Sequence, residues 1–181
     1  MNKHMEIAMN YKVEEEFEAY GYKCAVIFHR MGHRCGYVGV PRDHPLYGKH
    51  YDERLPINVE DCPDLPVVNI LAAMCLDTSK DKRINIANFF QVHGGITYAK
   101  GEKNYPIESD GLWWFGFDCA HAGDSPDYDK VQEYFGETPF RYNTPDDVVR
   151  SLEYAVNETV NLATQLREYE VQYGDHEKEI P

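Results

Sequence analysis

The sequence predicts one α+β domain, in which a long C-terminal helix packs on one face of a mostly antiparallel β-sheet. Short apolar runs separated by turn residues are typical of strands, and the last apolar segment instead repeats at helical spacing. The chain has 181 residues, 43% of them apolar, which is enough for a single hydrophobic core. We therefore expect a single domain over residues 1–181, with flexible ends at 1–10 and 170–181.

The first part of the chain predicts a helix followed by a β-hairpin. Residues 13–20 contain apolar side chains at helical spacing, so we expect a short helix there that Gly21 ends. Residues 22–29 contain a continuous apolar run, CAVIF, which is typical of a strand buried on both faces. A turn at 30–33 leads into a second strand at 34–40, whose glycines indicate a bulge or the close approach of another segment.

The middle of the chain predicts two more strands between irregular segments. Residues 41–66 are rich in proline and charge and predict a long irregular excursion. The apolar run within 64–76 fits either a bent strand or a short buried helix. Residues 89–98 predict a strand with Gly94-Gly95 at its middle, and residues 112–117 predict a strongly apolar, buried strand.

Two helices are predicted near the C-terminus. We expect a short one over 127–135, after a turn at 123–126. The long one begins at Thr144-Pro145-Asp146-Asp147, which supplies a hydroxyl at the N-cap, a proline at the first helical position and acids in the first turn. From Val148 to Leu166 the apolar residues recur at helical spacing, so this helix should lie across one face of the sheet.

The charge of the chain argues against binding to duplex nucleic acid. The formal net charge is −13, whereas duplex binding needs a basic surface that displaces counterions. Residues 22–50 are the exception, with five lysines and arginines, one aspartate and four histidines. This basic island could attract a small anion, or its charges could pair with the acidic remainder of the protein.

Other features of the composition predict a cytoplasmic protein without membrane association. The longest apolar run, Ile70–Leu76, is too short to span a bilayer, and the N-terminus has charges but no apolar segment of a signal peptide. The five cysteines are scattered and form no C-x-x-C pair, so a disulfide framework is not expected.

The strand at 112–117 ends in a cluster of groups that can carry protons or bind metal. The sequence LWWFGFDCAHAGD changes within two residues from apolar side chains to Asp118, Cys119, His121 and Asp124. Together with His93, the two aspartates and this histidine could form a metal site that activates water, or a general acid–base pair. In the alternative interpretation, the aspartates only bond backbone amides in a turn.

Two nearby patterns also have both a functional and a structural interpretation. His33-Arg34-Cys35 and Cys119-Ala120-His121 could surround a structural zinc ion if they were neighbours, although the close cysteine pairs of most such sites are missing. His93-Gly94-Gly95 could present backbone amides to an anion, or its glycines could form a bulge within a strand.

The segment His44–Asp52 combines aromatic rings, bases and imidazoles in one loop. Such a loop could close over a planar, phosphate-bearing ligand by stacking and charge, or it could pack on its own tyrosines and bind nothing. In the binding interpretation, the phosphate contacts are Arg34, Arg42 and Lys49, and the stacking residues are Tyr47, Tyr51 and Trp114.

Three segments carry a resemblance that covers much of the chain: Gly32–Glu53 (GHRCGYVGVPRDHPLYGKHYDE), Val92–Tyr98 (VHGGITY) and Leu112–Asp124 (LWWFGFDCAHAGD). In this order they resemble a family of small hypothetical proteins encoded by tailed bacteriophages and prophages. The resemblance implies an accessory protein that acts in the cytoplasm of the host cell. Such proteins often antagonise host defence, by binding a host protein or by sequestering or degrading a nucleotide signal, which is an analogy at the level of genomic context.

Three functional hypotheses follow from these patterns. In the first, a single pocket built from residues 32–53, the His93 turn and residues 118–124 binds a small anionic, nucleotide-like ligand. In the second, the histidines and aspartates of the same pocket act as a metal-dependent or acid–base phosphodiesterase. In the third, the acidic surface binds a host protein. The motifs G-x-S-x-G and H-E-x-x-H and the glycine-rich loops of nucleotide-binding proteins are absent, and no motif names a particular metal or cofactor.

Overall fold

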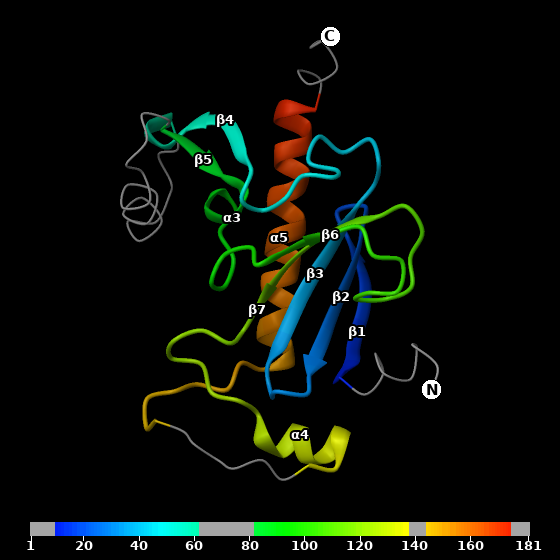
Figure 1. Ribbon diagram of the computed structural model, residues 1–181, viewed down its shortest axis with the longest axis vertical. Helices are drawn as coiled ribbons and strands as arrows, with labels where there is room; N and C mark the ends of the chain where they lie inside the picture. Colours follow the sequence, from blue (N-terminus) through cyan, green and yellow to red (C-terminus); the bar gives the residue numbers. More distant parts are fainter. Residues whose placement is uncertain (1–9, 62–81, 138–143, 175–181) are drawn as a thin grey trace.

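Figure 1 shows the fold in a computed structural model, which describes residues 10–61, 82–137 and 144–174. Five strands form one antiparallel sheet in the order β1-β2-β3-β7-β6, and helix α5 (Leu152–Tyr173) packs along it. This confirms the predicted α+β class. The strands are β1 (Tyr11–Ala19), β2 (Tyr22–His29), β3 (Arg34–Val40), β6 (Tyr98–Lys100) and β7 (Trp113–Asp118).

A second, smaller sheet contains two strands, β4 (Arg54–Asn58) and β5 (Arg83–Asn85). β4 is followed by the 3-10 turn η1 (Val59–Asp61), and β5 runs directly into helix α3 (Ile86–Phe89). The irregular excursion predicted for 41–66 is therefore wrong at β4. This segment pairs with β5, with Arg54 opposite Asn85 and Asn58 opposite Arg83. The undecided segment 64–76 lies outside the described residues.

Apolar side chains cover both faces of the large sheet. On the face toward α5, Val38, Phe115 and Leu162 belong to one cluster of buried side chains. On the opposite face, Ile27 and Trp114 belong to a second buried cluster. The burial of β2 on both faces, which its continuous apolar run predicted, is confirmed.

Helix α5 approaches the sheet closely at Gly36. A Cβ atom at this position would lie 2.2 Å from Thr159 Oγ1 and 2.5 Å from a ring carbon of Phe117. The close approach predicted for a glycine of this strand is therefore confirmed. The register between β2 and β3 is unbroken from one end to the other, so the alternative of a bulge in β3 is wrong.

Residues 13–19 belong to β1, and the helix predicted there is wrong. β1 and β2 are joined by Tyr20 and Gly21, which have positive φ angles of 53° and 86°, as a tight two-residue hairpin turn requires. The ladder bonds of a nine-residue strand outweigh the helical spacing of a few apolar side chains, because a short isolated helix is marginal in water.

A β-bulge in β1 turns Glu14 toward the protein interior. The register shifts between Val13 and Glu15, so that Glu14 is the extra residue. Arg34 Nε donates to Glu14 Oε2 over 2.6 Å, and Arg34 Nη2 donates to Glu14 Oε1 over 3.0 Å. The side chains of Arg34 and Glu14 are only 5% and 3% exposed, so this two-pronged ion pair is part of the core.

The same guanidinium joins three further segments. Arg34 Nη1 donates to the carbonyl oxygen of Arg150, just before α5, over 2.8 Å. It also lies 3.4 Å from an oxygen of Asp127, the N-cap of helix α4 (Tyr128–Phe135). The short helix predicted at 127–135 is confirmed, and Arg34 lies in the interior rather than at an exposed phosphate contact.

The strand predicted at 89–98 is wrong. Residues 86–89 form α3, and strand β6 begins only at Tyr98. The loop between them contains Gly94 and Gly95, whose φ angles of 67° and 83° lie in the left-handed region. Two left-handed residues cannot continue a strand, so the bulge predicted at these glycines is also wrong and His93 lies on a loop.

Helix α5 begins at Leu152, several residues after the predicted start at Thr144. Ser151 is the N-cap, and its hydroxyl accepts from the backbone N–H of Tyr154 over 3.1 Å. The predicted start fails because Val148 forms a bridge with Asp124, which keeps the backbone before the helix extended.

At its other end, α5 continues through residues 170–173, which the sequence assigned to the flexible end. The ring of Tyr173 lies 4.6 Å from that of Tyr169 and packs against the core. None of the helices in the described ranges has the length and apolar character needed to cross a bilayer.

We predict that Arg34→Met lowers the free energy of unfolding by about 3–5 kcal/mol, because it leaves the Glu14 carboxylate buried without its partner. The matched control is Arg167→Met, which removes an exposed arginine from an ion pair with Glu170 and should change stability little. Urea denaturation followed by circular dichroism measures both changes. Equal losses in the two variants would contradict the structural role of the Arg34–Glu14 pair.

Candidate functional site

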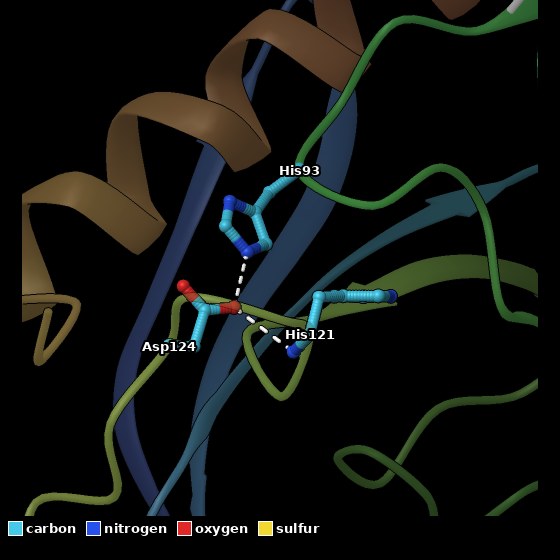
Figure 2. Close-up of side chains that lie close together, drawn as sticks. All are labelled: His93, His121 and Asp124. Atoms are coloured by element: carbon cyan, nitrogen blue, oxygen red, sulfur yellow. Dashed lines mark hydrogen bonds and ion pairs between the residues drawn. The ribbon is translucent and has the colours of Figure 1, made fainter. Parts of the chain in front are cut away.

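Two imidazoles and one carboxylate meet at the end of the sheet where β7 finishes (Figure 2). Among the described residues, His93, His121 and Asp124 are the one group of three or more potential metal ligands, with ligand atoms all within 4.8 Å of one another. His93 comes from the loop between α3 and β6, and the other two come from the turn after β7. The structure thus brings together three of the four residues predicted as catalytic.

The turn after β7 is built by its two aspartates. Asp118 Oδ1 accepts from the N–H of Ala120 over 3.1 Å, and Asp124 Oδ2 accepts from the N–H of His121 over 3.0 Å. Both aspartates therefore bond backbone amides, as the turn interpretation predicts, but these amides are not their only partners. Asp118 also accepts from Thr97 Oγ1 over 2.8 Å and does not join the group of three. Asp124, in contrast, bonds both the backbone of the turn and side chains beyond it.

The Asp124 carboxylate is buried and fully bonded. Its side chain is 2% exposed; Oδ2 lies 2.6 Å from His93 Nε2, and Oδ1 accepts from Arg150 Nε over 2.7 Å. Burial by itself would raise the pKa of Asp124, but the bonds from Arg150, the His121 amide and the His93 ring outweigh it and lower the pKa below its usual value. Asp124 is therefore a stable anion at neutral pH.

Helix α5 fixes the position of His93 from the other side. His93 Nδ1 lies 2.9 Å from the hydroxyl of Tyr154, and the backbone N–H of His93 donates to Glu158 Oε2 over 2.9 Å. Tyr154 and Glu158 are one turn apart on the helix. Both nitrogens of the His93 ring are hydrogen-bonded, Nε2 to the carboxylate of Asp124 and Nδ1 to the hydroxyl of Tyr154.

The His121 ring is held by packing rather than by hydrogen bonds. A Cβ atom at Gly94 would lie 2.0 Å from His121 Cε1, so a glycine is required there for the ring to lie against the loop. His121 Nδ1 is buried and has no hydrogen-bond partner among the described residues. It lies 3.9 Å from Asp118 Oδ1, which is too far for a hydrogen bond. One potential ligand nitrogen of the site is thus unused.

Two further histidines lie near this end of the sheet. The rings of His29 and His33 stack with centroids 5.1 Å apart. Burial lowers the pKa of His33, and the neighbouring His29 lowers it further, while Asp118 opposes the shift. Burial also lowers the pKa of His29. Both rings are therefore mainly neutral at pH 7, when they can still donate and accept hydrogen bonds.

The structural zinc site predicted from His33-Arg34-Cys35 and Cys119-Ala120-His121 does not form. The two segments are neighbours, since the N–H of Cys119 donates to the carbonyl of Arg34 over 2.9 Å. No thiol, however, belongs to the potential metal ligands found among the described residues. Burial raises the pKa of both thiols to about 12, so they behave as small apolar core residues.

The other predicted ligand-binding residues lie at the opposite end of the sheet. β3 and β7 pair from Cys35↔Asp118 to Val40↔Trp113, a separation of about 17 Å at the usual rise per residue. The loop that contains Arg42 to Tyr51 leaves β3 at the Val40 end. The single pocket predicted from residues 32–53, His93 and residues 118–124 is therefore divided between two ends of the molecule.

In that loop, the predicted residues contact one another and the sheet. The Arg42 guanidinium lies 6.0 Å from the ring centroid of Tyr47, and the carbonyl of Lys49 accepts from Trp113 Nε1 over 3.0 Å. Tyr51 stacks on His50 with ring centroids 4.1 Å apart. Trp114 is fully buried, on the face away from α5. These contacts favour the interpretation in which the loop packs on its own side chains.

The sequence interpretation missed Arg150, Tyr154 and Glu158, which hold the site from the segment before α5 and from its first two turns. The sequence did contain a pattern that could have identified two of them, since Tyr154 and Glu158 are spaced by one helical turn and so lie on the same side of a helix. This pattern was not recognised because a helix that starts at Thr144 would place Tyr154 and Glu158 in its middle, whereas they lie near the start of α5.

Comparison of the chain with protein-family models, curated proteins and solved structures found no match. Two imidazoles and a carboxylate form a ligand set that suits zinc and similar ions and leaves at least one coordination position for water. Without a metal, the same groups form a histidine oriented by an aspartate, as in general acid–base catalysis.

We predict that Gly94→Ala destabilises the protein more than Gly136→Ala does. The two glycines have nearly the same φ, 67° and 69°, but a Cβ atom at Gly136 meets no atom of the described residues within 4 Å. Gly136→Ala should cost about 1–2 kcal/mol of backbone strain, and Gly94→Ala should add the displacement of the His121 ring. Urea denaturation measures the difference, and the histidine side-chain signals in NMR spectra report the ring. Equal destabilisation with an unmoved His121 signal would contradict the packing described.

Proposed function

We propose that His93, His121 and Asp124 bind a divalent transition-metal ion such as Zn²⁺, and that the ion activates water to hydrolyse a small anionic phosphate ester. The observation that carries this proposal is the convergence of the three ligand groups within 4.8 Å. The buried His121 Nδ1 without a hydrogen-bond partner supports it, since buried polar atoms normally have a partner.

The groups around the three ligands suit a metal site. Metal-bound histidines usually donate their second ring N–H to a neighbouring acceptor, which orients the ring. The Tyr154 hydroxyl, 2.9 Å from His93 Nδ1, can accept this N–H and leave Nε2 for the metal. Arg150 holds Oδ1 of Asp124 and leaves Oδ2 on the side of the two histidines. Tyr154 and Arg150 thus hold His93 and Asp124 at atoms other than Nε2 and Oδ2, and a bound ion would replace the hydrogen bond between these two atoms.

Such a site would supply both the nucleophile and the charge for hydrolysis. A zinc ion with three protein ligands lowers the pKa of its bound water to about 7, which gives hydroxide at neutral pH. The Arg150 side chain, 28% exposed, lies at the edge of the site and offers positive charge to an anionic substrate. The whole protein has a net charge of −13, so a local positive charge matters for binding an anion.

The resemblance to phage accessory proteins suggests which phosphate ester to test. Degrading a nucleotide signal of the host would antagonise host defence, so cyclic and linear dinucleotides are the first candidates. This assignment of the substrate rests on the resemblance, whereas the metal site and the reaction class rest on the side chains.

We predict that the chain binds one Zn²⁺ ion and that His121→Ala weakens this binding at least tenfold, because it removes one of three ligands. The matched control is His50→Ala, since His50 is a half-exposed histidine in the loop at the other end of the sheet. Isothermal titration of chelator-treated protein measures the affinities, and elemental analysis measures the stoichiometry. The proposal fails if wild-type protein binds no Zn²⁺, or if the two variants weaken binding equally.

Hydrolysis is tested separately with bis(p-nitrophenyl) phosphate and with cyclic dinucleotides. We expect release of product by the Zn²⁺-loaded protein, loss of release after chelation, and loss in Asp124→Asn. Zinc binding without any hydrolysis of these substrates would agree with the proposed metal site but would contradict the proposed hydrolytic reaction.

We also predict that Tyr154→Phe weakens Zn²⁺ binding by about 10- to 100-fold, as removal of an orienting partner of a ligand does. The phenylalanine ring keeps the packing against His93 and removes only the hydroxyl. The free energy of unfolding of the apo protein, measured in urea, shows whether the fold has changed. Unaltered affinity would show that the Tyr154 hydroxyl does not orient His93.

A further inference from the structure

A groove runs along the outer edge of β1, far in the sheet order from the strand that carries the metal ligands. Its volume is about 480 Å³, and β1 contributes Tyr11, Lys12, Val13 and Glu16 to its lining. Consecutive strand residues point to opposite faces of a sheet, so a hollow that touches residues 11, 12 and 13 must follow the edge of the strand itself. In the part of the chain that the structure describes, β1 has β2 as its sole neighbour, so its outer backbone groups face this groove.

Two walls enclose this edge. One is the loop 104–108, where Ile107 is buried and the carbonyl of Asn104 accepts from the Tyr11 hydroxyl over 3.4 Å. The other is the end of α4, where the ring centroid of Tyr134 lies 3.8 Å from Lys12 Nζ. Contacts to β1 thus fix both walls in place. An extended peptide adds to a sheet about 4.8 Å from the edge strand, which is the position that these walls flank.

The exposed charged side chains of β1 are mainly acidic, since Lys12 is the one base beside three glutamates. Glu15, Glu16 and Glu18 are exposed on β1 and form no ion pair with any other described residue. Glu108 lines the groove on the opposite wall. Burial raises the pKa of Tyr11, and the negative charge of Glu102 nearby raises it further. A segment that pairs with β1 therefore meets more negative than positive charge.

We infer that this groove binds an extended, basic peptide segment of a partner protein, which pairs with β1 as an additional strand of the sheet. Backbone pairing supplies affinity in such complexes, and side chains select the sequence. Lysine or arginine residues of the peptide would face Glu16 and Glu18 on one face of the sheet and Glu15 on the other. Its apolar residues would meet Ile107 on one face and Tyr134 on the other. This interaction is independent of the metal site and of the proposed hydrolysis.

Charge selects this occupant over a second copy of the chain. Pairing of β1 with β1 of another copy would bring the same three glutamates together, and like charges opposite each other destabilise a strand pair. Charged side chains and bulges are also the means by which proteins protect an edge strand from self-association. β1 has both, with its bulge at Glu14 and glutamates beyond it.

The test uses a synthetic ten-residue peptide in which pairs of lysines alternate with pairs of valines, so that both residue types occur on both faces of an extended strand. The comparison peptide has the same sequence with N-methyl groups on alternate backbone nitrogens. Fluorescence anisotropy at physiological salt gives the affinities, and hydrogen exchange gives the protection of the β1 amides. We expect binding with protection of β1, at least tenfold weaker binding of the N-methylated peptide, and at least tenfold weaker binding to the variant Glu15→Lys/Glu16→Lys/Glu18→Lys.

A matched variant with the same change in charge is Asp52→Lys/Asp146→Lys/Glu153→Lys, whose three acids are exposed elsewhere on the protein. It should bind the peptide nearly as well as the wild type, and urea denaturation confirms that both variants fold. Equal affinity for the two peptides, or equal losses in the two variants, would mean attraction by net charge alone and would overturn the inference. Protection of β1 that instead rises with protein concentration, without peptide, would identify a second copy as the occupant and would also overturn it.

Discussion

The buried carboxylate of Asp124 is the group on which the geometry of the site depends. A buried carboxylate is costly unless it is paired and hydrogen-bonded. Asp124 meets this requirement with the Arg150 guanidinium, the His93 ring and the His121 amide. These donors come from the segment before α5, the loop after α3 and the turn after β7. One anion therefore draws three distant segments to the same point, and as a consequence the two imidazoles lie side by side.

Arg150 connects this site with the interior of the protein. Its carbonyl accepts from Arg34, which is held by Glu14 in the buried ion pair of the sheet, while its side chain donates to Asp124. The bulge of β1, the ion pair, the start of α5 and the candidate metal ligands thus form one continuous chain of polar contacts. The sheet fixes one end of this series of polar contacts. The candidate site at the other end is therefore rigid before any ligand binds, as a functional site requires.

Much of the fold follows from local patterns, and the errors occur where tertiary contacts override them. The strands β2, β3 and β7 were predictable because continuous apolar runs leave few other structures. β1 was not, because a bulge and an exposed edge give it a mixed pattern that resembles a helical one. The loop around Gly94 was read as a strand, since the need for left-handed residues beside the His121 ring leaves no trace in a hydrophobic pattern. For the site, the polar cluster after β7 indicated two of the three side chains that lie close together, but the loop that faces this cluster depends on the topology of the sheet.

The central claim is that Asp124, His93 and His121 are held so that they take one metal ion. The most direct measurement is a crystal structure of Zn²⁺-equilibrated protein with anomalous diffraction recorded at the zinc absorption edge. The account predicts one strong anomalous peak about 2.0–2.2 Å from a nitrogen of His93, a nitrogen of His121 and an oxygen of Asp124. A peak at other residues, or no peak while His93 keeps its hydrogen bond to Asp124, would contradict it.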